Sequence, residues 1–319
     1  MNLRQCSFVF AGLFFLGATA LSATYPEKPV RFIVAFPAGG NADLISRVVA
    51  QKLSESFKHA FVVDNRGGAG GVIGEELAAK SPPDGYTMVL VSLAHTVNPN
   101  LNKPTTYDPV NDFVPVSLVA SVPNVLLVHN SVPAKTVPEF IALAKSKPGQ
   151  LNYVASLGTS LHISGELFKA MAGVDLVAIT YKSGAGAAPD LEAGRVQVSF
   201  SVISTAISTL KSGRVRALAV TSAKRSMILP DLPAIAEFVP GYELTGWQGI
   251  LMPRGTPPAI VNAISREIAL AMRNPEVQAR MVSFGADPIG STPEQFGAFR
   301  KAEFPRIAKL MSQTGMKAH

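Results

Sequence analysis

Two short loops rich in small residues are the segments of this sequence best suited to holding an anion. One loop spans Pro37–Asp43 and the other spans Ser156–Ser160. Each follows an apolar run and precedes an amphipathic stretch, which predicts the junction between a buried strand and the start of a helix. A helix start leaves backbone N–H groups without intrahelical partners, and the helix dipole adds partial positive charge there. Both loops therefore predict anion sites that need no lysine or arginine.

The predicted donors in these loops are backbone N–H groups and hydroxyls, because glycine lets the backbone approach a ligand closely. His162 would lie in the first turn of the second helix, where it could donate a hydrogen bond or act only as a structural histidine. A carboxylate beside an anion would repel it, so Asp43 is expected to cap its helix or orient the loop. The loops lie about 120 residues apart, roughly one domain's length, and could face one cleft. The donors come from Gly39, Gly40, Asn41, Gly158, Thr159 and Ser160.

A serine hydrolase is the main enzymatic alternative. The segment Gly158–His162 resembles the nucleophile elbow of hydrolases but lacks its last glycine. The only later histidine is His319, so the usual order of acid and base is missing. An exported hydrolase that uses Ser160 is kept as the alternative, while the main interpretation predicts no catalytic residue.

The sequence contains no complete motif for binding a metal or a dinucleotide cofactor. His162 and Glu166 lie one helical turn apart, but a third metal ligand is not apparent. The glycine-rich segment 67–74 lacks the final glycine of the dinucleotide fingerprint. The single cysteine, Cys6, excludes a disulfide scaffold and a thiolate metal site from the rest of the chain. We therefore expect no metal and no cofactor.

Composition also narrows the class of protein. The 319 residues are 47% hydrophobic and 16% charged, so a sizeable core in one or two domains is expected. The formal net charge is +7, from 29 Lys and Arg against 22 Asp and Glu. Because these basic residues are scattered rather than clustered, nucleic-acid binding is not expected.

Residues 1–23 predict a secretory signal peptide. Arg4 precedes the apolar stretch Cys6–Ala20, and the end of that stretch, Ala18–Ala20, and the next residues, Leu21–Ala23, both offer small residues suited to cleavage. A single membrane anchor is the alternative, although the stretch is short for a span of about 20 residues. The signal predicts that the protein is exported.

The rest of the chain alternates strand and helix patterns. This βαβα order predicts a mainly parallel sheet with helices on both faces. Helices are expected from Leu44, over Phe140–Ser146 after a Thr136 cap, from about Leu161, and from Pro293; the part after Pro257 is expected to be mostly helical. The predicted strands are Arg31–Phe36, Phe61–Asn65, Met88–Ser92, Asn124–His129, Leu151–Ala155, Val196–Phe200 and Arg216–Val220.

An ordered set of motifs over essentially all of the mature chain resembles a known family, the substrate-binding proteins of tripartite tricarboxylate transporters (the Bug or TctC-type family). The segments that carry the resemblance are Tyr25–Val30, Phe36–Gly40 with Asp43, Asn65–Gly71 with Gly74, Pro83–Thr87, Tyr107–Pro109, Pro148–Tyr153, Gly158–His162, Leu218–Ser222 and Gly255–Pro258.

The resemblance implies an α/β fold of the periplasmic binding protein type II-like class, with two α/β lobes and a ligand cleft between them. Lobe 1 would comprise residues 24–122 and 226–319, and lobe 2 would comprise residues 123–225. The chain would cross between the lobes near Ser121–Asn124 and again near Thr221–Leu229. The implied function is to capture a small carboxylate and deliver it to the membrane permease subunits of a tripartite transporter, as a monomer; a sensor protein for the same ligands is an alternative.

The family's ligand-binding positions fall on three segments of this chain. The carboxylate would be held between the two glycine-containing loops, and the distal end of the ligand would meet Leu93, His95, Tyr181 and Ser201. These side chains favour a mono- or dicarboxylate with an apolar or aromatic body. Compared with the family pattern, the second loop is one residue shorter, Ser183 replaces a glycine, and Ser201 replaces a frequent aspartate. The predicted ligand-binding residues are Phe36, Ala38, Gly39, Gly40, Asn41, Asp43, Ser92, Ala94, Ser156, Gly158, Thr159, Ser160, His162, Tyr181 and Ser201.

Overall fold

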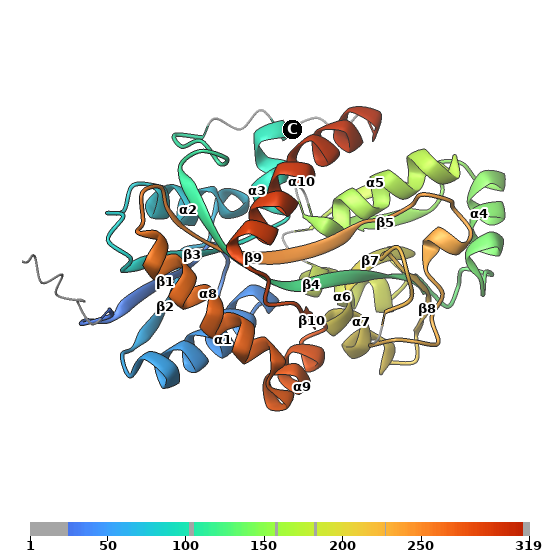
Figure 1. Cartoon of the computed structure of the whole chain (residues 1–319). Coiled ribbons are helices and arrows are strands. Elements are labelled where there is room, and N and C mark those ends of the chain that lie inside the picture. Colours follow the sequence, from blue (N-terminus) through green and yellow to red (C-terminus); the bar gives the residue numbers. More distant parts are fainter. Residues whose placement is uncertain (1–24, 102–104, 157–158, 182–183, 227, 315–319) are drawn as a thin grey trace, which may run out of the picture.

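Two α/β lobes joined by long strands make up the chain (Figure 1). The computed structural model describes residues 25–101, 105–156, 159–181, 184–226 and 228–314. The predicted signal peptide, Gly158 and Ser183 lie outside the described residues. No helix of the described ranges is long and apolar enough to cross a membrane.

Lobe 1 is built on a sheet whose first strands are parallel, in the order β2-β1-β3. The helices α1 and α8 cover one face of this sheet, and α2, α3 and α10 cover the other (Figure 1). The elements are β1 (Val30–Val34), α1 (Asn41–Phe57), β2 (Phe61–Asn65), the short 3-10 helix η1 (Ala69–Gly71), α2 (Val72–Ala79), β3 (Thr87–Ser92), α3 (Ala94–Val97), η2 (Asn98–Leu101), α8 (Pro258–Arg273), α9 (Pro275–Ser283), β10 (Asp287–Pro288) and α10 (Pro293–Thr314).

Lobe 2 has the same layered construction. The strands β6, β5 and β7 are parallel neighbours. Aromatic side chains of α4 and α5 pack on one face, where Phe140 stacks on Phe168 and Phe168 contacts Phe200 of β7. The elements are α4 (Val137–Ser146), β5 (Asn152–Ala155), α5 (Ser160–Ala172), β6 (Val177–Thr180), α6 (Gly184–Glu192), β7 (Val198–Val202), α7 (Ile203–Leu210), β8 (Val215–Val220) and η3 (Ile235–Glu237).

Two antiparallel strands connect the lobes. The strand β4 (Phe113–His129) pairs with β9 (Thr245–Pro253) up to Pro123, and from Asn124 onward it pairs with β7 and β8. One strand thus belongs to both sheets. The expected mainly parallel sheet is only part of the architecture, because every pair that β4 and β9 make is antiparallel. The expected helical end of the chain is confirmed by α8, α9 and α10.

The segment after β8 packs with lobe 2 over more residues than the sequence suggests. Ala234 forms a parallel bridge with Val220, and the Leu244 N–H donates to the Thr221 carbonyl at 3.0 Å. Tyr242 is fully buried, and its hydroxyl donates to the Ser164 carbonyl of α5. We therefore propose that the return crossing lies at Leu244–Thr245, rather than at residue 225.

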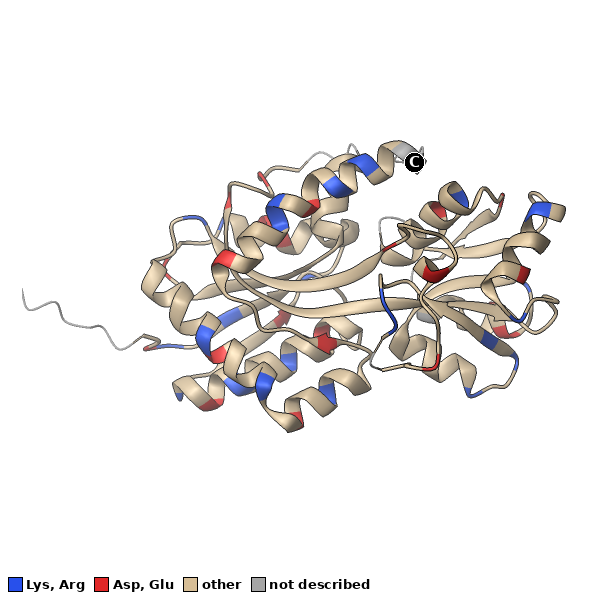
Figure 2. Ribbon diagram, turned by 45° about the vertical axis from the view of Figure 1, so that its right-hand side comes forward, with Lys and Arg blue, Asp and Glu red and all other residues tan. Residues whose placement is uncertain are grey.

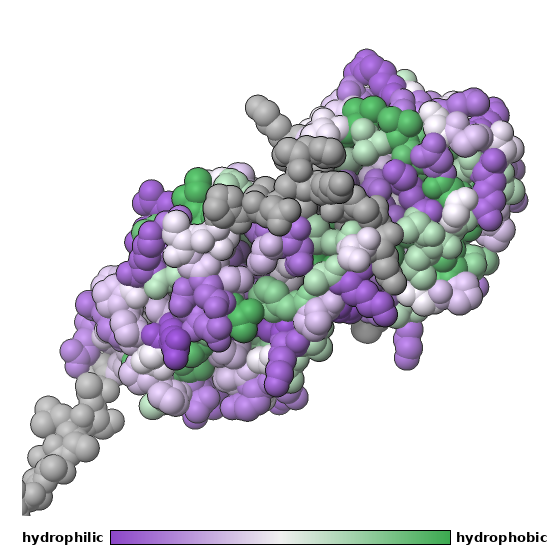
Figure 3. Space-filling model, turned by 90° about the horizontal axis from the view of Figure 1, so that it is seen from above, coloured by the Kyte–Doolittle hydropathy of each residue, from purple (hydrophilic) through white to green (hydrophobic). Residues whose placement is uncertain are grey.

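Charged residues are spread over the outer helices of both lobes (Figure 2). On the face seen from above, hydrophilic and hydrophobic residues of the described ranges are interspersed over both lobes (Figure 3). This distribution matches the scattered charge of the sequence.

Candidate ligand cleft between the lobes

A cleft between the two lobes brings most of the predicted loop residues together. It consists of an inner part of about 170 Å³ and an outer part of about 510 Å³, which share several lining residues. The inner part is lined by Phe36, Asn41, Ala42, Ser92, Leu93, Ala94, Val122, Thr159, Ser160, Leu161, Val202, Gly246, Trp247 and Gln248. The outer part is lined by Phe36, Pro37, Ala38, Gly39, Gly40, Asn41, Ala42, Ser156, Thr159, Leu161 and Gly184.

Helix starts from both lobes converge on this cleft. Gly40 precedes α1 and Thr159 precedes α5 as N-cap residues, and neither makes a side-chain cap hydrogen bond. Gly184, the first residue of α6, also lines the outer part. None of the described lining residues is charged. Within the described part of the cleft, the attraction for an anion comes from backbone N–H groups and helix dipoles.

The first loop is held in shape by Asp43. The Gly39 N–H donates to Asp43 Oδ2 at 2.9 Å, and Arg47 Nε donates to the same oxygen at 3.0 Å. Burial alone would raise the pKa of the Asp43 carboxyl, but the hydrogen bonds from Arg47 and Gly39 outweigh it and lower that pKa below its ordinary value. Asp43 is buried and is not among the described residues that line the cleft. Its contacts are those of a residue that orients the loop.

The second loop is tied to the crossing strand β4. Thr159 Oγ1 donates to the Ser156 carbonyl at 2.7 Å. Ser160 Oγ donates to Asn124 Oδ1 at 3.3 Å, at the position where β4 passes into lobe 2. An amide oxygen cannot take up the hydroxyl proton, so this contact does not activate Ser160 as a nucleophile.

The third predicted segment, at the end of β3, also reaches the cleft. Ser92 and Ala94 both line the inner part, and Ser92 Oγ accepts a hydrogen bond from the Ala94 N–H at 3.2 Å. The expectation that His95 meets the ligand is wrong, because its side chain is buried in lobe 1. There, His95 Nδ1 lies 2.7 Å from Glu75 Oε2, and the ring packs against Phe113 and Phe304.

Three other predicted residues are not among the described residues that line the cleft. Tyr181 Oη donates to Asp190 Oδ2 at 2.7 Å within lobe 2. Ser201 is buried, with its hydroxyl 2.8 Å from that of Ser199. His162 is 8% exposed on α5. Their contacts with a ligand stay predictions. Within the described ranges, no group of three or more His, Cys, Asp or Glu residues could hold a metal ion.

Sequence reasoning missed the part of the cleft that the crossing strands supply. Val122 of β4 and Gly246, Trp247 and Gln248 of β9 line the inner part. Gln248 Nε2 donates to Asn41 Oδ1 at 2.9 Å, and Asn41 Nδ2 donates to the Phe284 carbonyl at 2.6 Å. No local pattern marks these residues, because β9 itself was not predicted and Gln248 lies 207 residues from Asn41 in the sequence.

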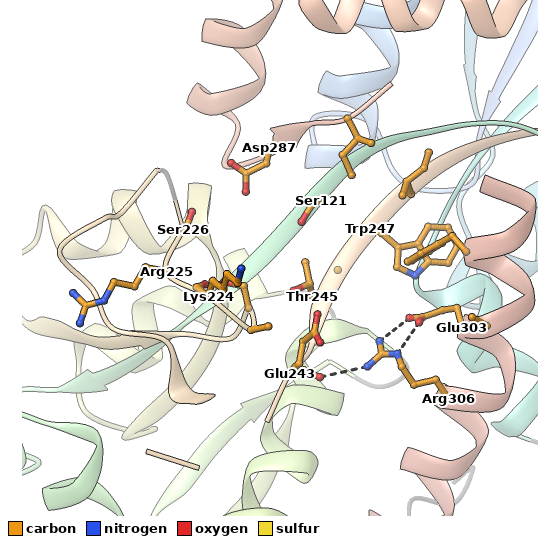
Figure 4. A pocket seen from close by; sticks show the side chains of 17 residues that line it. Ser121, Lys224, Arg225, Ser226, Glu243, Thr245, Trp247, Asp287, Glu303 and Arg306 are labelled. Carbon is orange, nitrogen blue, oxygen red and sulfur yellow. Dashed lines mark hydrogen bonds and ion pairs between the residues drawn. The ribbon is translucent and has the colours of Figure 1, made fainter. Parts of the chain in front are cut away.

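A separate pocket of about 650 Å³, the rear pocket, lies behind the crossing strands (Figure 4). Side chains alternate between the two faces of a strand, and Ser121 pairs with Trp247 while Val122 pairs with Gly246. Ser121 and Thr245 line only the rear pocket, and Val122 and Gln248 line only the ligand cleft, while Gly246 and Trp247 line both. The cleft and the rear pocket therefore lie on opposite faces of the same two strands.

Both lobes contribute charged groups to the rear pocket. Lys224 comes from the segment after β8, and Asp287 comes from β10 (Figure 4). On α10, Arg306 donates to both carboxylate oxygens of Glu303, at 2.7 and 2.8 Å. Burial raises the pKa of the Asp287 carboxyl above its ordinary value. A rotation of the lobes about β4 and β9 would change the widths of the cleft and the rear pocket in opposite directions.

Comparisons with known proteins agree with this architecture. The family model described as "Tripartite tricarboxylate transporter family receptor" matches residues 45–316. The chain belongs to this receptor family. It is 35% identical to Protein BugT of Bordetella pertussis over 95% of this chain and 94% of that protein. The structure of Rpa4515 from R. palustris with adipate matches with a TM-score of 0.84 and 38% identity, over 91% of this chain and 98% of that one. MatC from Rhodopseudomonas palustris with bound malate matches with a TM-score of 0.78 and 27% identity, over 90% and 99%.

Proposed function

We propose that this receptor captures a small carboxylate in the periplasm and delivers it to the membrane subunits of a tripartite transporter. The observation that carries the proposal is the convergence of the α1 and α5 starts, one from each lobe, on a cleft with no charged side chain among its described lining residues. The N–H groups of a helix start lack intrahelical partners, so two such starts suit a carboxylate, whose charge they can stabilise without a lysine or arginine. Relatives with adipate and malate support the ligand class.

Capture would proceed by closure of the lobes. The α1 start moves with lobe 1 and the α5 start moves with lobe 2, so a carboxylate that accepts hydrogen bonds from both links the lobes. The crossing strands β4 and β9 supply the connection about which the lobes rotate. A ligand that contacts both lobes only in the closed state shifts the population toward that state. The closed, loaded receptor would then dock on the transporter as a monomer.

The body of the ligand would occupy the inner part of the cleft. Phe36, Leu93, Val122, Leu161 and Val202 give this part a mostly apolar wall. A second carboxylate would find no lysine or arginine among the described lining residues and would rely on neutral donors. We therefore propose a mono- or dicarboxylate with an apolar or aromatic body.

A thermal-shift screen of the mature chain tests the ligand class. The panel would contain mono-, di- and tricarboxylates and aromatic acids, each with its neutral amide as the matched control. A ligand at 100 times its Kd adds about 2.7 kcal/mol to the free energy of unfolding. At about 2–4 °C per kcal/mol, the midpoint should rise by roughly 5–10 °C for an acid and not for its amide. The absence of a rise with every acid, in protein free of co-purified ligand, would refute the proposal.

A further inference from the structure

Gln248 presents a buried amide in the floor of the ligand cleft. It lies within β9, paired with Ser92 of β3 and with Ala120 of β4. Because side chains alternate along a strand, Gln248 projects to the same face as position 246, whose partner Val122 on β4 lines the cleft but not the rear pocket. The residue lines the inner part of the cleft and is only 6% exposed.

Neighbouring hydrogen bonds fix which end of this amide is free. The Phe284 carbonyl can only accept, so Asn41 must turn its Nδ2 toward it, and the two atoms lie 2.6 Å apart. Asn41 Oδ1 is thereby turned toward Gln248 and accepts from Gln248 Nε2 at 2.9 Å. The remaining atom, Gln248 Oε1, is buried and has no hydrogen-bond partner among the described residues.

A buried acceptor without a donor is costly, and a ligand could remove that cost. A carboxylate oxygen carries no proton and would be repelled by Gln248 Oε1, whereas a hydroxyl could donate to it. An ammonium group could also donate, but no described lining residue carries the negative charge that would offset its desolvation. Ser92, on the neighbouring strand, accepts from the Ala94 N–H and can donate its own proton to the same ligand hydroxyl.

We propose that Gln248 makes this receptor selective for hydroxycarboxylates over the corresponding unsubstituted acids. The inference rests on the proposed carboxylate-binding function and adds a chemical group that the ligand must carry. Helix starts would hold the carboxylate, and Gln248 Oε1 with the Ser92 hydroxyl would recognise the hydroxyl on the carbon chain.

Calorimetric titration with matched pairs of acids tests the selectivity. The pairs are malate with succinate, 2-hydroxyglutarate with glutarate, and phenyllactate with 3-phenylpropionate, with aspartate as the amine-bearing control. For each pair that binds, the hydroxyl should lower the Kd roughly tenfold, as expected when a buried acceptor gains its donor. The Gln248→Met variant should lose this preference, while Gln150→Met, an exposed glutamine in lobe 2, should keep it.

The possible failures can be distinguished. Equal affinities within each wild-type pair would overturn the selectivity and leave carboxylate capture intact, whether or not the Gln248→Met variant folds. A preference that persists in a folded Gln248→Met protein would overturn the role of Gln248. No binding of any acid would overturn both the proposed function and this inference.

Discussion

Replacing Asn41 by aspartate would place a negative charge at the start of α1, inside the ligand cleft. Asn41 is the first residue of α1 and lines both parts of the cleft. The substitution replaces the amide NH2 group by a carboxylate oxygen, so the side chain keeps its size. It adds the only charged side chain among the described lining residues. The variant therefore tests the electrostatic part of the account.

The expected loss of affinity is large. Two like charges about 6 Å apart at an effective dielectric constant of about 20 repel by about 2.8 kcal/mol. A loss of this size weakens carboxylate binding roughly 100-fold. Stability should also fall by about 1–3 kcal/mol, because the Phe284 carbonyl loses its donor and faces an oxygen instead.

Titration calorimetry and urea unfolding would measure the two effects separately. Asn274→Asp is the matched control, since Asn274 caps α9 by accepting from the N–H groups of Glu276 and Val277, which aspartate can also do. That variant should keep both its affinity and its stability. A folded Asn41→Asp protein that binds acids as tightly as the wild type would refute the placement of the carboxylate beside α1.

Three further predictions concern the loop, the rear pocket and pH. Gly39→Ala should destabilise the protein by roughly 1 kcal/mol in urea unfolding, because φ is 81° at Gly39, whereas Gly40→Ala, at φ −80°, should change stability little. Equal effects would contradict the predicted strain. Ser121→Phe should fill the rear pocket, hold it open and thereby favour the closed cleft. If about a tenth of the free wild-type molecules are closed, the Kd for the carboxylate should fall by up to tenfold. A folded variant with unchanged affinity would argue against closure about these strands. The folded-state pKa of Asp43 is lowered, so the stability that its carboxylate contributes is present above its ordinary pKa and is lost as the pH falls through the folded value. Asp43→Asn should therefore flatten the decline of the unfolding free energy between neutral and acidic pH. An equally steep decline in the variant would count against this role.

The features that the sequence predicted well are local ones. The strand Phe61–Asn65 was predicted with its observed bounds, and the start of α5 at Ser160 lies one residue from the prediction. The cap of α10 is reciprocal, as its spacing indicates: the Gln295 N–H donates to Thr292 Oγ1, and the Thr292 N–H donates to Gln295 Oε1. In each case the apolar run, the cap and the helix are neighbours in sequence, so a short window contains the physics that forms them.

The features that were missed depend on contacts between distant segments. The bonds of Asn41 to Gln248 and to Phe284 join residues 207 and 243 positions apart. The strand β9 is buried along almost its whole length and lacks the polar alternation of a half-exposed strand. His95 looks like a cleft residue from its place after β3, yet the short helix α3 turns its ring into lobe 1 toward Glu75. Tertiary packing, rather than local pattern, decides these positions.

The most direct test of the account is a crystal structure of the mature protein with a carboxylate that the screen identifies. The account predicts one carboxylate group between the Gly39–Asn41 segment and the Thr159–Ser160 segment, accepting hydrogen bonds from backbone N–H groups of both lobes. A carboxylate held instead by a lysine or arginine, or bound in the rear pocket behind β4 and β9, would contradict the central claim that two helix starts form the anion site.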